Sequence, residues 1–311
     1  MSVTATQIKD LREKTGAGML DAKNALIEAG GDMEKASELL RQKGMATAEK
    51  KSGRTAAEGT VASHVAANNK SGILVEINCE TDFVAKGEPF QQLAKEVCEQ
   101  VMTQNPDSVE TLLAQPSMFL SGQTVQGYLT EKIGTIKENI NVRRFVRYEL
   151  AGAGRIHSYI HTGGKIGVLV ELTSDNASVE SNDAFAALAK DLAMQIASAA
   201  PEFVDRNGIS PEVIEAETRV EMGKDDLANK PEDIRKKIVA GRVDKLLAQR
   251  VLLEQPFVKD PGKTVSGLMD EVGAQLGAKI GITRFTRYML GEGIEKKESN
   301  FAEEVMAAQR V

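Results

Sequence analysis

Apolar residues concentrate in two short stretches in the first half of the chain, at 61–66 and 73–79, with a polar turn at 68–70 between them. Two apolar stretches joined by a short polar turn indicate a β-hairpin. Farther along, Leu93, Val97 and Val101 recur at helical spacing. A third strand is predicted next, with four apolar residues alternating onto one face: Ile140, Val142, Val146 and Tyr148.

The same pattern occurs twice in the chain. Residues 72–77 (GILVEI) match 167–172 (GVLVEL) at an offset of 95, whereas 144–148 (RFVRY) match 284–288 (RFTRY) at an offset of 140. The second copy must therefore contain an insertion of about 45 residues, between roughly 200 and 250. We predict a duplicated α+β core of two antiparallel-sheet subdomains, the first at 60–150 and the second at 151–204 together with 251–290.

The inserted segment, 205–250, has a helical pattern. Ser210 and Pro211 form a typical helix start, and Lys230-Pro231 breaks the pattern once. Helices are expected from Pro211 to about residue 229 and from about 231 to 254, which makes an antiparallel hairpin. Its charged outer face favours a projecting arm; the alternative is a hairpin that lies flat on the core.

The N-terminal 45 residues have the pattern of a small separate module. Three short amphipathic helices are expected, and Asp32 is placed to cap the third. Residues 46–59 (ATAEKKSGRTAAEG) are small, polar and basic, which is typical of a linker.

Composition narrows the range of functions. The net charge of −6 makes a protein that coats nucleic acid a poor candidate. The cysteines, Cys79 and Cys98, fit reduced thiols in a cytosol rather than a disulfide scaffold or a zinc site. There is no apolar run of the ~18 residues that a membrane span needs, and the first residues lack a signal-peptide core. We therefore expect a cytoplasmic protein.

Residues that carry chemistry are sparse. None of the three histidines lies in a metal-binding spacing, and no serine lies in a nucleophile elbow. Gly262-Lys263-Thr264 is similar to the end of a phosphate-binding loop, but Phe257 stands where that loop needs glycine. We expect no enzyme activity, no metal or cofactor, and no nucleotide binding by the chain itself.

One basic and aromatic stretch leaves a second hypothesis open. The segment 143–148 (RRFVRY) is compatible with an RNA surface. Strand alternation would divide its arginines between two faces, and the matching segment at 284–288 favours a repeated sheet position.

The two copies differ at one tetrapeptide. Thr81-Asp82-Phe83-Val84 aligns with 176–179 (NASV), although the flanking positions match. The core therefore does not require these four residues. Phe83 is a candidate interface anchor at the turn from strand to helix; the alternative is that its ring packs beneath the helix as core.

Two longer motifs carry a resemblance to a known family. Residues 76–86 (EINCETDFVAK) and 11–26 (LREKTGAGMLDAKNAL) resemble the two signatures of the bacterial elongation factor Ts family, in the family's order. The resemblance also covers the duplicated core, the inserted hairpin and the tail from Gly291.

The resemblance implies both an organisation and a function. It implies that residues 1–45 are a ubiquitin-associated-like (UBA-like) module, that the hairpin is a coiled coil, and that 291–311 form a C-terminal helical module. It further implies a guanine-nucleotide exchange factor for elongation factor Tu, working without covalent chemistry, nucleic acid or membrane. An RNA- or ribosome-associated adaptor without exchange activity is the alternative. The residues implied to contact Tu are Thr81, Asp82, Phe83 and Val84 near its Mg²⁺ site, Gly18, Met19 and Leu20 near its phosphate loop, and His161 at its third domain.

Overall fold

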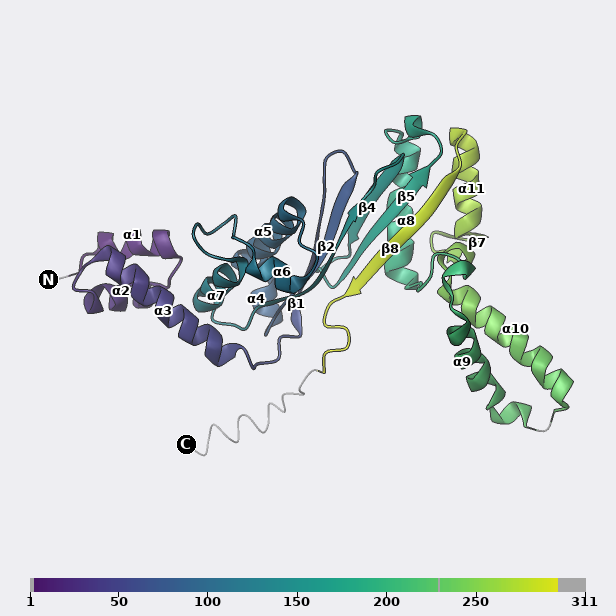
Figure 1. Cartoon of the computed structure of the whole chain (residues 1–311), viewed down its shortest axis with the longest axis horizontal. Helices are drawn as coiled ribbons and strands as arrows, with labels where there is room; N and C mark the ends of the chain where they lie inside the picture. The colour runs from purple at the N-terminus through teal and green to yellow at the C-terminus, as the bar shows by residue number, and fades with distance from the viewer. Residues whose placement is uncertain (1–2, 229, 296–311) are drawn as a thin grey trace.

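The computed structural model describes residues 3–228 and 230–295, and the predicted C-terminal module lies almost wholly outside this range. The chain is α+β and elongated: the N-terminal helices lie at one end, an inserted helical hairpin lies at the other, and two sheets with their helices lie between them (Figure 1). Among the described residues no helix is long and apolar enough to cross a membrane.

The first copy of the core is a three-stranded antiparallel sheet with helices packed on one face. The strand order is β1-β2-β3. A cluster of buried apolar side chains, including Phe90, Leu93 and Val97, fills the space between sheet and helices. The elements are β1 (Glu58–Val65), β2 (Ser71–Cys79), α4 (Asp82–Lys86), α5 (Glu88–Gln104), α6 (Val109–Ala114), α7 (Val125–Ile136) and β3 (Asn141–Glu149).

The second copy repeats this arrangement, which confirms the predicted duplication. Its strand order is β4-β5-β8, and α8 and α11 take the places of α5 and α7. The elements are β4 (Gly154–Ile160), β5 (Ile166–Ser174), η1 (Ala177–Val179), α8 (Asp183–Ala199), η4 (Leu252–Glu254), β6 (Pro256–Phe257), β7 (Asp260–Thr264), α11 (Val265–Leu276) and β8 (Ile280–Met289).

A buried glutamine at the same place in each copy makes equivalent hydrogen bonds. The Gln100 side chain donates to the carbonyl of Pro116 at 3.1 Å, and that of Gln195 donates to the carbonyl of Pro256 at 3.2 Å. Each amide oxygen in turn accepts a backbone N–H from the following loop. A buried amide needs these partners, so both copies fix the same loop in the same way.

The two sheets contact each other through reciprocal interactions. Val61 N donates to Gly164 O at 2.7 Å, and the equivalent Ile156 N donates to Asn69 O at 2.8 Å, so the hairpin turn of each copy clasps the first strand of the other. Ser63 donates to its own counterpart, Ser158, at 3.0 Å. A shared apolar cluster lies between the sheets: Val61, Leu74, Tyr148, Leu150, Ile156, Leu169 and Tyr288.

A β-bulge in β3 overturns one sequence prediction. The register between β2 and β3 shifts at Glu76/Ile77, which makes Arg143 an extra residue in its strand. A one-residue shift exchanges the faces of all later side chains. Val142 therefore packs against the helices, whereas Val146 and Tyr148 pack between the sheets, and the expected single apolar face is wrong.

The bulge also changes the interpretation of the arginines. Because the alternation is broken, Arg143 and Arg144 both reach the buried carboxylate of Glu76, at 3.0 and 2.6 Å. The Arg144 guanidinium also lies over the ring of Tyr288, 4.2 Å from its centre. These two guanidinium groups therefore bind within the protein, on the face between the sheets. Arg147 pairs with Ile73, whose side chain belongs to the helix-side core, so the arginines are divided between two faces as expected, although Arg143 and Arg144 are not separated from each other.

The N-terminal module consists of α1 (Ala5–Thr15), α2 (Met19–Glu28) and α3 (Met33–Lys51), around a small core that includes Leu11 and Leu26. Asp32 caps α3, as predicted. The predicted linker is wrong over residues 46–51, which continue α3. The reason is packing: Gly44 of α3 crosses α7 closely at Gly134, where an added Cβ would lie 2.7 Å from the Gly44 Cα, and Ala48 reaches the core.

The inserted hairpin consists of α9 (Pro211–Met222), η3 (Asp225–Leu227) and α10 (Glu232–Arg250), preceded by η2 (Arg206–Gly208). The first helix ends earlier than predicted, at Met222, because Gly223 follows and a 3₁₀ turn then buries Leu227. The hairpin has an apolar cluster of its own and extends away from the sheets (Figure 1).

We predict that replacing residues 205–250 with a short glycine linker leaves the remaining fold intact. The chain leaves and re-enters the core at neighbouring points, since Leu252 N donates to Phe203 O at 2.8 Å, and the first copy lacks the insertion altogether. Circular dichroism and a thermal melt measure the outcome. A variant without a cooperative melt would mean that the core depends on the hairpin.

Candidate functional site

The tetrapeptide that distinguishes the two copies lies on the surface. Thr81 ends the connection from β2 and caps α4, its hydroxyl accepting from Val84 N at 3.2 Å. Phe83 follows, and 85% of its surface is exposed. The alternative that this ring packs as core is therefore wrong, and a large apolar side chain held in water is a candidate interface anchor.

The residues that flank the segment 81–84 anchor it in the first core. Ala85 and Cys79, on either side of it, are buried in the first core. Burial, with the nearby charge of Glu138, raises the pKa of the Cys79 thiol to about 12, so the sulfur stays protonated and unreactive at neutral pH. The exposed Phe83 ring therefore belongs to a short segment that is buried in the core at both ends.

Glu80, which directly precedes the segment 81–84, connects it to α3. Glu80 accepts from the backbone N–H of Asn139 at 2.7 Å and pairs with Arg54 and Lys51 at 3.2 and 3.6 Å. Burial acts to raise the pKa of Glu80, but the Asn139 hydrogen bond and these two cations lower it overall. The carboxylate is therefore charged at neutral pH.

Asp82 is exposed beside Phe83 and pairs with Lys86 at 2.7 Å. The hydrogen bond and charge of Lys86, with a further contribution from Lys165, lower the pKa of Asp82. Lys165 belongs to the β4–β5 turn, so this turn of the second copy lies near the 81–84 segment of the first.

His161 begins the same turn. It is exposed, and its Nδ1 lies 3.0 Å from the Tyr159 hydroxyl, which orients the imidazole. Gly164 of this turn accepts from Val61 N. The structure therefore brings His161 and the 81–84 segment to the same end of the paired sheets, although about 80 residues separate them in sequence.

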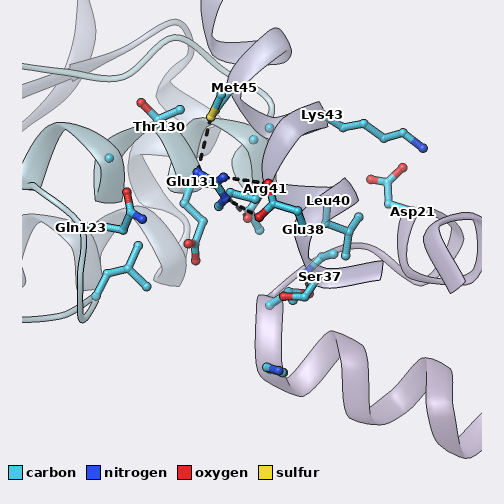
Figure 2. Close-up of a pocket in the computed structure, with 18 of the residues that line it drawn as sticks. Asp21, Ser37, Glu38, Leu40, Arg41, Lys43, Met45, Gln123, Thr130 and Glu131 are labelled. Atoms are coloured by element: carbon cyan, nitrogen blue, oxygen red, sulfur yellow. Dashed lines mark hydrogen bonds and ion pairs between the residues drawn. The ribbon is translucent and has the colours of Figure 1, made fainter. Parts of the chain in front are cut away.

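The candidate residues of the N-terminal module are exposed but form a separate surface. Gly18 precedes α2, and Met19 and Leu20 are 63% and 68% exposed. They lie outside the groove of about 750 Å³ that is lined by residues of α2, α3 and α7. Figure 2 shows that polar and charged side chains such as Glu38, Arg41 and Glu131 line this groove.

The loop after α7 connects the two surfaces. Lys137 pairs with Asp21 of α2 at 3.4 Å, and the next residue, Glu138, binds the backbone of the 81–84 segment. Sequence reasoning missed both residues. A signal was present for Glu138, because the second copy has Ala278 at the same place in the repeat.

Within residues 3–228 and 230–295, no group of three or more His, Cys, Asp and Glu side chains could hold a metal ion. Lys263, in the segment similar to a phosphate loop, pairs with Glu271 at 2.7 Å, and Thr264 caps α11. What the site offers is an exposed apolar ring with charges beside it, which suits protein binding.

Comparisons with known proteins agree with the motifs. The family model described as "Elongation factor TS" matches residues 80–292. The chain is 51% identical over 308 residues to "Elongation factor Ts" of Trichlorobacter lovleyi, covering 99% of each protein. It is 48% identical to that of Nostoc punctiforme, covering 98% of each, and 46% identical to that of Methylococcus capsulatus, covering 100% of this chain and 99% of the relative.

Proposed function

The chain belongs to the elongation factor Ts family, and from this premise we propose that it is a guanine-nucleotide exchange factor for elongation factor Tu. It binds Tu carrying GDP and promotes release of the nucleotide, so that GTP can bind during translation elongation. The observation that carries the proposal is Phe83, an aromatic ring 85% exposed on a firmly held turn.

In the proposed mechanism, the 81–84 segment wedges into the GTPase domain of Tu. Phe83 enters an apolar site between helices and Asp82 lies beside it, while Thr81 and Val84 support them. The intrusion disturbs the Mg²⁺ ion of Tu. That ion neutralises phosphate charge, so its displacement weakens the hold on GDP.

Exchange of this kind requires differential affinity alone. A factor that binds nucleotide-free Tu more tightly than the GDP complex must weaken GDP binding by the same factor, since the two equilibria are linked. Acid, base or nucleophile is therefore not needed, and an exposed ring that binds one form of Tu better than the other is sufficient.

Two further contacts complete the proposed interface. Met19 and Leu20, with Gly18, lie against the GTPase domain near its phosphate loop, and His161 faces the third domain of Tu. Their exposure supports these assignments. We also propose that the N-terminal module is UBA-like, that the α9/α10 hairpin is a coiled coil, and that the protein acts in the cytoplasm.

We predict that the purified chain binds no GDP itself but accelerates release of a fluorescent GDP analogue from Tu. Lys263 is already paired and the glycine that a phosphate loop needs is missing, so the segment similar to such a loop is not expected to hold a nucleotide. Equilibrium dialysis measures binding, and stopped-flow fluorescence measures release. Unchanged GDP release from Tu would refute the exchange function, and stoichiometric GDP binding by the chain alone would refute the expected absence of a nucleotide site.

A further inference from the structure

We propose that Glu138 is a positioning residue for exchange: its carboxylate holds the 81–84 segment in the conformation that presents Phe83. The inference rests on the proposed function, because it assigns a role within the same site. Glu138 is on the loop after α7, 57 residues away from Thr81 in sequence, and its role is to bind the backbone that carries the ring.

The contact is a triple one. One carboxylate oxygen of Glu138 accepts from the backbone N–H groups of Glu80 and Thr81, at 3.0 and 3.1 Å. The other oxygen accepts from the Thr81 hydroxyl at 2.6 Å. Hydrogen bonds to a charged acceptor are the stronger kind. One carboxylate therefore holds both the backbone N–H and the hydroxyl of Thr81.

The Thr81 hydroxyl passes this constraint on to α4. While it donates to Glu138, it accepts from Val84 N at 3.2 Å. That helix has only five residues, too few to be stable without outside support. Phe83 itself supplies little packing to hold it, being 85% exposed. The orientation of the ring therefore depends on the cap, and the cap depends on Glu138.

The internal repeat separates this role from general structural support. In the first copy Asn139 N donates to Glu80 at 2.7 Å, and in the second the equivalent Lys279 N donates to Asp175 at 2.7 Å. That bond serves the fold of both copies. The equivalent of Glu138 is Ala278, so the extra carboxylate occurs only in the copy with the exposed aromatic ring.

The test is a double-mutant cycle with full-length protein and Tu carrying a fluorescent GDP analogue. Glu138→Ala should slow stimulated GDP release by about tenfold. In the Phe83→Ala background, the same substitution should change release by less than twofold, because a misplaced ring and a missing ring have the same effect. Glu271→Ala, which removes an exposed ion pair of the second copy, is the control and should leave release unchanged.

A second measurement reports on the loop directly. In Glu138→Ala, amide hydrogen exchange should accelerate at residues 80–84, while protection of β2 and α5 and the melting temperature stay near those of the parent. Glu138→Gln retains an acceptor oxygen and should restore part of both the protection and the release rate. A purely structural role would instead lower protection throughout the first copy.

Two results would overturn the proposal. In the first, a folded Glu138→Ala protein stimulates GDP release from Tu at the parent rate. In the second, Glu138→Ala slows that release equally in the presence and absence of Phe83. Failure of the proposed function would give a different result. The unsubstituted protein would then not accelerate GDP release from Tu, or the Phe83→Ala protein would accelerate it as well as the parent does. The four proteins of the cycle, measured together, distinguish these cases.

Discussion

Phe83→Ala should slow stimulated GDP release from Tu by about tenfold to several hundredfold while leaving the melting temperature nearly unchanged. A ring of this size buried at an interface contributes on the order of 2–4 kcal/mol, and each ~1.4 kcal/mol is a factor of ten. In the free protein the ring is 85% exposed, so its removal costs the fold little. Stopped-flow release and a thermal melt of the same variant measure the two effects.

The matched control is Val220→Ala, which removes an exposed apolar side chain from α9 of the hairpin. It should leave release near the rate of the parent protein. Parent-like release by a folded Phe83→Ala protein would refute the mechanism for the 81–84 segment. A large fall in melting temperature would show that the ring supports the fold after all.

Glu76→Ala should destabilise the protein by about 3–5 kcal/mol, the cost of removing one partner from a buried ion pair. The Glu76 side chain is fully buried and accepts from Arg143, Arg144 and the backbone N–H of Gly291, the last at 2.8 Å. Its loss removes the buried anion that both arginines share, leaves Arg144 with Glu292 at 3.3 Å, and removes the hydrogen bond that holds the segment after β8. Chemical denaturation followed by circular dichroism measures the change.

The second copy provides the control for Glu76. Among the residues that the structure describes, Glu171 binds only the side chain of Arg284, at 2.8 Å, and that arginine is more exposed than Arg144. Glu171→Ala should therefore cost clearly less, about 1–2 kcal/mol. Equal losses from the two substitutions would mean that the extra partners of Glu76 add nothing.

The contribution of Glu76 should also depend on pH. Burial acts to raise its pKa, but the hydrogen bonds from Gly291, Arg143 and Arg144 lower it below the usual value. A carboxylate with a depressed folded-state pKa stabilises the protein above its unfolded value of about 4.3 and loses that effect as pH falls through the folded value. The stability difference between parent and Glu76→Ala should therefore be constant near neutrality and shrink in acid below about pH 4.

The repeated core was predictable because the positions that pack in the core are apolar and recur at regular spacing in the sequence. Two copies of one hydrophobic pattern must form the same layers, and a position that differs while its neighbours agree is free of the demands of the core. This reasoning singled out Phe83 but left its exposure open, since spacing alone does not distinguish a ring beneath a helix from one above it.

Other features depended on contacts that the local pattern does not record. The bulge at Arg143 places two consecutive arginines beside Glu76, which strict alternation would have separated. Residues 46–51 have the composition of a linker, yet they are helical because α3 packs against α7. Glu138 acts on a loop 57 residues away and belongs to no motif.

The reciprocal contacts between the sheets have a consequence for how the interface with a partner can evolve. Ser63 bonds to its own counterpart, and each hairpin turn clasps the other copy, which is the geometry of a symmetric homodimer joined into one polypeptide. In a dimer of identical subunits, any gene change would appear on both sides. After fusion each half varies alone, so one side can acquire Phe83 and Glu138 while the other keeps Ser178 and Ala278. A single chain can thus present one such ring to one partner, whereas a dimer of identical halves would present two.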